Sequence, residues 1–202
     1  MPPSLVARYT YRLHVQASIL EGLFAGLIVT NDVVMQKSLG STQWQLVLLT
    51  MAPNLLYLIS PITAHHAYRV DRFRLFLAAG ILGRLTLLVM AFIHGPWPYL
   101  GLFAMQSLMQ SFLIPAQNAL YQQNYTPSVR GRLYGRASMY GTLAGGLAAL
   151  VSGLVFDQDP DAYRWLYPIA GVVGLASCIA YGRIRLRRAE PPINPPPPAE
   201  SG

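Results

Sequence analysis

Residues 137–156 read ASMYGTLAGGLAALVSGLVF, a run of twenty residues without a charged side chain. An α-helix rises about 1.5 Å per residue, so a run of this length crosses the roughly 30 Å hydrocarbon core of a bilayer. In lipid, a helix satisfies its own backbone hydrogen bonds. A strand of a membrane barrel is only about half as long as this run, so the run does not fit a barrel. The run therefore predicts a membrane-spanning helix.

Five further apolar runs surround this one. They cover residues 13–35, 44–64, 75–93, 97–120 and 163–181. Turn-forming residues separate the runs, and tryptophans stand at three of the run ends, where their rings favour the headgroup level. The chain is only 11% charged, against about 25% in soluble domains. We therefore expect an all-α membrane protein with six transmembrane helices over residues 1–188, followed by a disordered, proline-rich cytoplasmic tail over residues 189–202.

The distribution of basic residues predicts the orientation. Twelve arginines lie before the first run, between the second and third, between the fourth and fifth, and after the sixth, whereas Lys37 and Arg164 alone lie on the opposite side. Positive loops stay in the cytoplasm. We therefore expect a multi-pass protein of the plasma (inner) membrane with both termini cytoplasmic. The net charge of +7 reflects this membrane topology. It does not indicate nucleic-acid binding, because the basic residues form no single face.

Ionisable residues inside the runs are the first candidates for a substrate or proton pathway. Each costs at least ~2.5 kcal/mol at the centre of a membrane helix unless it is paired or hydrated. Glu21 and Asp32 are eleven residues apart, close to three turns, so they should project from one face, and His14 lies on the same face. The alternative is that His14 and Asp32 lie at the two membrane interfaces.

Arg84 lies in the third run at nearly the depth of Glu21 in the first. An ion pair between Glu21 and Arg84 is therefore geometrically allowed. It could be a purely structural lock between two helices, or it could take part in transport.

The fourth run carries a stripe of amide side chains. Gln106, Gln110 and Gln117 fall near one another on a regular helix, with Tyr121 following them. Amides in lipid need partners, so the stripe either bonds to neighbouring helices or lines a substrate path. Asn54, beside Pro53, is a weaker candidate.

Enzyme motifs are not evident. The sequence carries no phosphate-binding loop, no nucleophile elbow and no paired metal-ligand spacing. We therefore expect neither catalysis nor a cofactor. The small residues Gly141, Gly145 and Ala149 form a face that favours close helix packing.

Residues 118–136 read NALYQQNYTPSVRGRLYGR. This stretch, with Arg130-Gly131-Arg132 in it, resembles the cytoplasmic loop between helices four and five of major facilitator superfamily transporters. The region 64–74, AHHAYRVDRFR, matches the signature between helices two and three of that family at Asp71 and Arg72 but lacks its glycines. The resemblance implies the N-terminal six-helix half of the fold, with the first and fourth helices facing a central cavity.

A complete member of that family has two six-helix halves. The resemblance therefore implies a half-size permease that carries a small solute after pairing as a homodimer or with a second six-helix half, unless the chain is a fragment. The alternative is a non-transporting membrane subunit or a truncated remnant with a scaffold role.

Reporter fusions test the predicted topology. Fusions after Pro96 and after Asp159 should report the external side, and fusions after Asp71 and after Arg132 the cytoplasmic side, because arginines are retained there. A cytoplasmic signal at Asp159 would contradict six spans.

Overall fold

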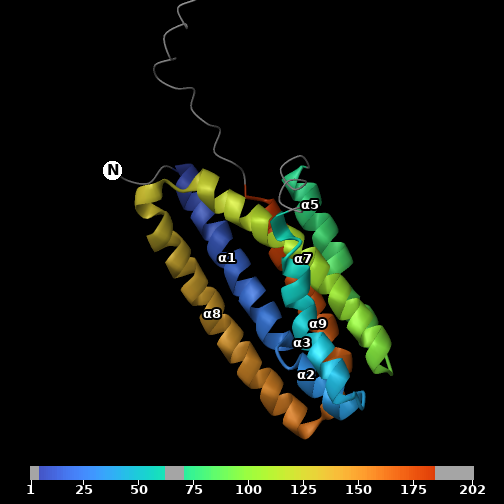
Figure 1. Cartoon of the computed structure of the whole chain (residues 1–202). Coiled ribbons are helices and arrows are strands. Elements are labelled where there is room, and N and C mark those ends of the chain that lie inside the picture. The colour runs from blue at the N-terminus through green and yellow to red at the C-terminus, as the bar shows by residue number, and fades with distance from the viewer. Residues whose placement is uncertain (1–4, 62–70, 185–202) are drawn as a thin grey trace, which may run out of the picture.

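The computed structural model describes residues 5–61 and 71–184, and all regular structure in these ranges is helical. Six helical rods run side by side in alternating directions (Figure 1). The first rod consists of α1 (Leu5–Ile28), α2 (Asn31–Val33) and the π-helical turn η1 (Val34–Ser38). The second is α3 (Gln43–Tyr57). The third consists of α5 (Arg72–Ala79), the π-helical turn η2 (Gly80–Arg84) and α6 (Thr86–Met90).

The second half of the chain forms the longer rods. The fourth rod is α7 (Pro96–Asn124), which continues through Pro115, and the fifth is α8 (Pro127–Gln158). A short 3₁₀ turn, η3 (Pro160–Ala162), leads into the sixth rod, α9 (Tyr163–Gly182). The prediction of six helices is confirmed, while the predicted tail 189–202 and residues 62–64 of the second run lie outside the described residues.

Four stretches of the described chain are long and apolar enough to cross a membrane. They are Tyr9–Ser38, Phe73–Met90, Pro127–Gln158 and Pro160–Gly182. Among the described residues α3 is only 15 residues long. Helix α7 carries no charge, but its glutamines and asparagines lower its mean hydropathy. Six membrane crossings therefore stay a prediction.

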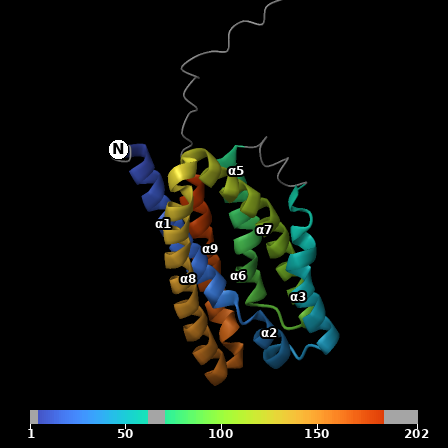
Figure 2. The ribbon, with the colours of Figure 1, turned by 60° about the vertical axis from the view of Figure 1, so that its left-hand side comes forward.

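Helices α1, α5 and α8 begin at one end of the bundle and α3 and α7 at the opposite end (Figure 2), and different residue types lie at the two ends. Arg12, Arg74 and Arg136 lie at the end where α1, α5 and α8 begin, which we call the basic end. Trp44 and Trp97 are exposed in the first turns of α3 and α7, at the opposite end. This separation is the pattern expected of two membrane interfaces.

Helix α8 begins ten residues earlier than the predicted run. Thr126 and Pro127 start it, and proline suits the first turn of a helix because its missing N–H would be unsatisfied there anyway. Arg130, Gly131 and Arg132 therefore belong to the first turns of α8, and the prediction that they form a loop is wrong. Hydropathy marks only the part of a helix that lipid would cover, so it missed the polar turns.

Small residues bring α1 against α8. A methyl group added to Gly22 or Gly26 would collide with the backbone of α8 at Gly141 or Gly145, and one added to Gly141 would lie 2.7 Å from the carbonyl oxygen of Ser18. The predicted close packing at Gly141 and Gly145 is confirmed. Without these glycines the two backbones could not approach so closely.

Substituting Gly141 tests this contact. Gly141→Ala should lower the free energy of unfolding by about 1–3 kcal/mol, because the added methyl has no room against Ser18. Gly146→Ala on the same helix is the control, since a methyl group there meets nothing within 4 Å. Thermal unfolding in detergent measures both, and equal melting temperatures would contradict the packing argument.

Candidate functional site

The third rod changes its helical pitch where it reaches the middle of the bundle. The π-helical turn η2 ends at Arg84, and such turns frequently mark functional positions in helices. Two glycines of α9 leave room for this residue: a methyl group on Gly171 would lie 2.8 Å from the Arg84 carbonyl oxygen, and one on Gly174 would lie 3.0 Å from its Cδ. Neighbouring backbones are thus shaped around a buried arginine.

Arg84 forms an ion pair with Glu21 of α1. Its Nη2 lies 2.5 Å from the Glu21 Oε1 and also donates to the Gln110 Oε1 of α7 at 2.7 Å. The Phe24 ring covers the guanidinium, with its centroid 3.8 Å from Cζ. The Arg84 side chain is 2% exposed. The structure therefore confirms the contact that the matched depths allowed.

Glu21 joins this buried network to open space. Its side chain is 22% exposed, and its second oxygen accepts a hydrogen bond of 2.9 Å from Ser177 of α9. The same residue lines a pocket of about 660 Å³ between α1, α7 and α8. The carboxylate thus has the buried guanidinium on one side and the pocket on the other.

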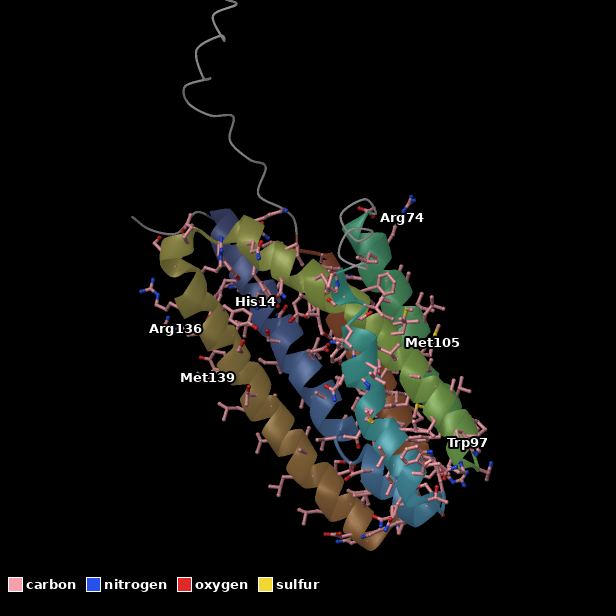
Figure 3. All side chains as sticks on the ribbon, viewed as in Figure 1. His14, Arg74, Trp97, Met105, Arg136 and Met139 are labelled. Atoms are coloured by element: carbon pink, nitrogen blue, oxygen red, sulfur yellow. The ribbon has the colours of Figure 1, made fainter. Side chains whose placement is uncertain are left out.

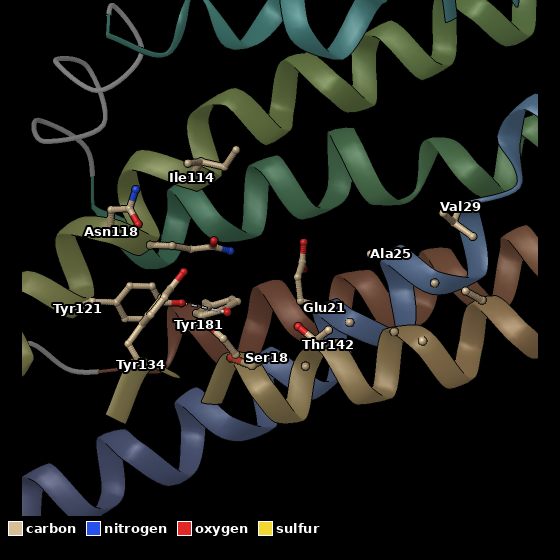
Figure 4. A pocket seen from close by; sticks show the side chains of 18 residues that line it. Ser18, Glu21, Ala25, Val29, Ile114, Asn118, Tyr121, Tyr134, Thr142 and Tyr181 are labelled. Atoms are coloured by element: carbon tan, nitrogen blue, oxygen red, sulfur yellow. Dashed lines mark hydrogen bonds between the residues drawn. The ribbon is translucent and has the colours of Figure 1, made fainter. Parts of the chain in front are cut away.

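The pocket has a floor from α1 and walls from α7 and α8 (Figure 4). Small residues dominate the α8 wall, where Gly145, Gly146 and Ala149 leave the space open. Amides from α7 provide hydrogen-bonding groups on the other wall, at Gln117 and Asn118. The pocket therefore combines an apolar surface with a few polar groups, which is the usual character of a small-molecule site.

Three tyrosines gather at one end of the pocket, Tyr121, Tyr134 and Tyr181 (Figure 4). The Tyr121 hydroxyl donates to the Tyr181 hydroxyl at 3.1 Å. Behind them His14 stacks on Tyr121, with ring centroids 4.3 Å apart, and its Nδ1 lies 2.9 Å from the Tyr125 hydroxyl. His14 is 1% exposed, so the protein itself covers its ring, while the alternative that His14 lies at the depth of a membrane interface stays a prediction. The rings of α7 and α8 bury it, and a pattern within α1 could not reveal them.

The structure brings together some of the predicted residues. Gln110 bonds to Arg84, Gln117 lines the pocket, and Gln106 is buried on the same helix. Asp32 does not join Glu21 on one face. Helix α1 ends at Ile28 and α2 begins at Asn31, so the helical spacing does not carry across the break. Asp32 is exposed beyond it.

Asn54 also lies apart from the site. It is exposed on α3, and its Nδ2 donates to the Thr50 carbonyl of the same helix at 3.2 Å. This contact satisfies the amide locally. Asn54 is absent from the residues that line the pocket.

The residues of the family-like motif hold the basic end together. Arg130 donates to the carbonyls of Gln122 and Tyr125 at 2.9 and 3.2 Å, where α7 ends. Cations favour the carbonyl end of a helix. Asp71 caps α5 by accepting a hydrogen bond from the Arg74 backbone N–H at 3.3 Å, and Arg72 is the first residue of α5.

Sequence reasoning missed two polar clusters. One is the contact of Ser177 with Glu21, because a serine within an apolar run resembles a small packing residue. The other is at the end opposite the basic end, where the hydroxyls of Tyr99 and Tyr167 lie 2.7 Å apart and both contact the Asn31 Oδ1, at 2.9 and 2.8 Å. The available signal was Asn31 itself, because an amide inside an apolar run needs hydrogen-bond partners on neighbouring helices.

Substitutions of the ion pair test its contribution to stability. Glu21→Gln should cost about 3–5 kcal/mol, because it leaves the buried guanidinium of Arg84 without its counter-ion. Arg84→Gln should cost less, since Glu21 keeps Ser177 and access to the pocket. The double variant should recover part of the loss, and melting temperatures in detergent measure all three.

Lys37 and Asp157 provide the matched control. Their ion pair is 3.9 Å long, and their side chains are 53% and 78% exposed. Lys37→Gln should therefore change the melting temperature little, because exposed pairs contribute at most about 1 kcal/mol. A Glu21→Gln protein as stable as the Lys37→Gln protein would refute the structural role of the buried pair.

Comparison with known proteins agrees with this geometry. No curated protein matches the chain. The sequence model of the Major Facilitator Superfamily, however, matches residues 17–202, which include the first rod from Ala17 onward, the other five rods and the residues of the pocket. Proteins of this family are membrane transporters, not enzymes. The chain therefore belongs to the major facilitator superfamily of membrane transporters.

Proposed function

We propose that the protein moves a small solute across the membrane by alternating access, with the pocket between α1, α7 and α8 as its part of the solute path. The observation that carries this proposal is the position of Glu21. Its carboxylate forms an ion pair with Arg84 and accepts a hydrogen bond from Ser177, and Glu21 also lines the pocket. Intramembrane charges of this kind commonly mark solute or ion pathways.

The network gives a solute a means to influence the helices. A solute that bonds to Glu21 competes with Arg84 and Ser177 for the same two oxygens. These partners come from the third rod and from α9, so weakening their bonds changes how three rods are held together. Glu21, Arg84, Gln110 and Gln117 are the residues that we assign to the path, and Gln106 lies buried on the same helix as the two glutamines.

A second six-helix unit would complete the pocket. The pocket has a floor from α1 and walls from α7 and α8, with Tyr181 of α9 at the tyrosine end. Among the described residues, no helix from the second or third rod lines it. We propose that a second copy of the chain, or another six-helix half, covers the open side, as transporters built from repeated halves require.

The charges suggest how the unit is oriented. All arginines named at the basic end would face the cytoplasm, where positive residues are retained. We therefore propose that both termini are cytoplasmic and that the protein resides in the plasma (inner) membrane. The motif residues Asp71, Arg72, Arg130, Gly131 and Arg132 then belong to the cytoplasmic surface.

Filling the pocket should abolish transport. Uptake of a panel of labelled sugars, amino acids, organic acids and organic amines is compared between cells with and without the protein. For any solute that the protein carries, Ala25→Trp should reduce uptake at least tenfold, because Ala25 lines the pocket. Leu147→Trp is the control, since Leu147 is exposed on α8 and absent from the pocket lining.

The oligomeric state of the protein is measured in parallel. Cross-linking or a native mass measurement in mild detergent should show a dimer or a bound second unit. A protein that stays monomeric, captures no partner and changes the uptake of no solute would contradict transport and favour the scaffold role. Equal uptake by the Ala25→Trp and Leu147→Trp proteins would show that the path does not use this pocket.

A further inference from the structure

A second hollow, of about 530 Å³, lies between α1 and α8 near the basic end. It is lined by Tyr11, Arg12, Val15 and Gln16 of α1 and by Tyr140 of α8. Its lining contains no acidic side chain. The hollow therefore offers a guanidinium, an amide and two phenol groups to a ligand.

This hollow faces away from the solute pocket. Arg12 and Gln16 precede Glu21 and Ala25 by nine residues each, which is two and a half turns of helix. Residues at this spacing project from opposite sides of a helix. Because Glu21 and Ala25 line the solute pocket, Arg12 and Gln16 point to the outer surface of the bundle, where a membrane protein meets lipid.

Arg136 adds a second cation at the rim of the hollow. It lies one turn before Tyr140 on α8 and points outward in Figure 3. The contacts of Gly22 with Gly141 and of Gly26 with Gly145 set a parallel register, which places Arg136 level with Ala17, about one and a half turns from Arg12. Both arginines are exposed, and neither forms an ion pair within the described residues. Two uncompensated positive charges thus flank one hollow.

An apolar stripe continues from the hollow along the second half of α8. It consists of exposed residues at helical spacing, Leu143, Leu147, Leu150 and Leu154. Tyr140 lies between this stripe and Arg136, and tyrosine favours the boundary between headgroups and acyl chains. The surface therefore has the order of a phospholipid, with positive charge at the headgroup level and leucines at the level of the chains.

We propose that this hollow binds an anionic phospholipid, with its phosphate between Arg12 and Arg136 and its acyl chains along the leucines of α8. Basic pockets between membrane helices bind such headgroups. Free phosphate would use the arginines but not the leucine stripe. The ligand is therefore a lipid of the surrounding leaflet, and the site is separate from the proposed transport path.

Native mass spectrometry of the purified full chain tests the proposal. The protein is titrated with phosphatidylglycerol, and Arg12→Gln/Arg136→Gln is compared with the wild type. Each arginine near an anionic surface contributes about 1 kcal/mol, so removing both should weaken the first phosphatidylglycerol adduct roughly 30-fold. Phosphatidylcholine, which carries no net charge, should bind both proteins equally.

Arg74→Gln/Arg183→Gln provides the matched control, because it removes two exposed arginines from the same end at α5 and α9. It should retain phosphatidylglycerol like the wild type. Equal weakening in the two double variants would overturn the proposal by showing a general charge effect. Undiminished binding in Arg12→Gln/Arg136→Gln, or displacement of the lipid by millimolar inorganic phosphate, would also overturn it.

Discussion

A guanidinium buried among apolar helices places the strongest constraint on this bundle. Arg84 must keep its charge, so it needs an anion and hydrogen-bond acceptors at its own depth. Glu21 and Gln110 supply them at 2.5 and 2.7 Å, and they come from α1 and α7. One side chain of the third rod thus decides which faces of two other rods must point inward.

The surrounding backbone is adapted to this side chain. A π-helical turn ends at Arg84, and glycines of α9 stand where larger residues would collide with it. Each residue of an α-helix rotates the side-chain direction by about 100°. Without the extra residue of the π-turn, the Arg84 side chain would therefore point about 100° away from its present direction. The ion pair, the turn and the glycines therefore form one structural unit. Glu21 belongs to this unit and to the pocket, so the stability of the bundle and the chemistry of the pocket are linked at this residue.

The glycine contact between α1 and α8 separates two surfaces with different chemistry. On one side, small residues leave room for a pocket whose polar groups converge on Glu21. On the other side, arginines and tyrosines precede a stripe of leucines. The two helices touch along their backbones. A substitution on one surface therefore does not reach the other surface.

Hydropathy and helical spacing are local properties, so they were enough to predict the six helices, the matched depths of Glu21 and Arg84 and the small-residue face of α8, and the loop motif carried the family resemblance. The burial of His14, the bond from Ser177 to Glu21 and the break that separates Asp32 from Glu21 became visible only in the folded bundle. The polar start of α8 also escaped hydropathy. These features depend on atoms from other rods or on backbone geometry, and a hydropathy pattern records neither.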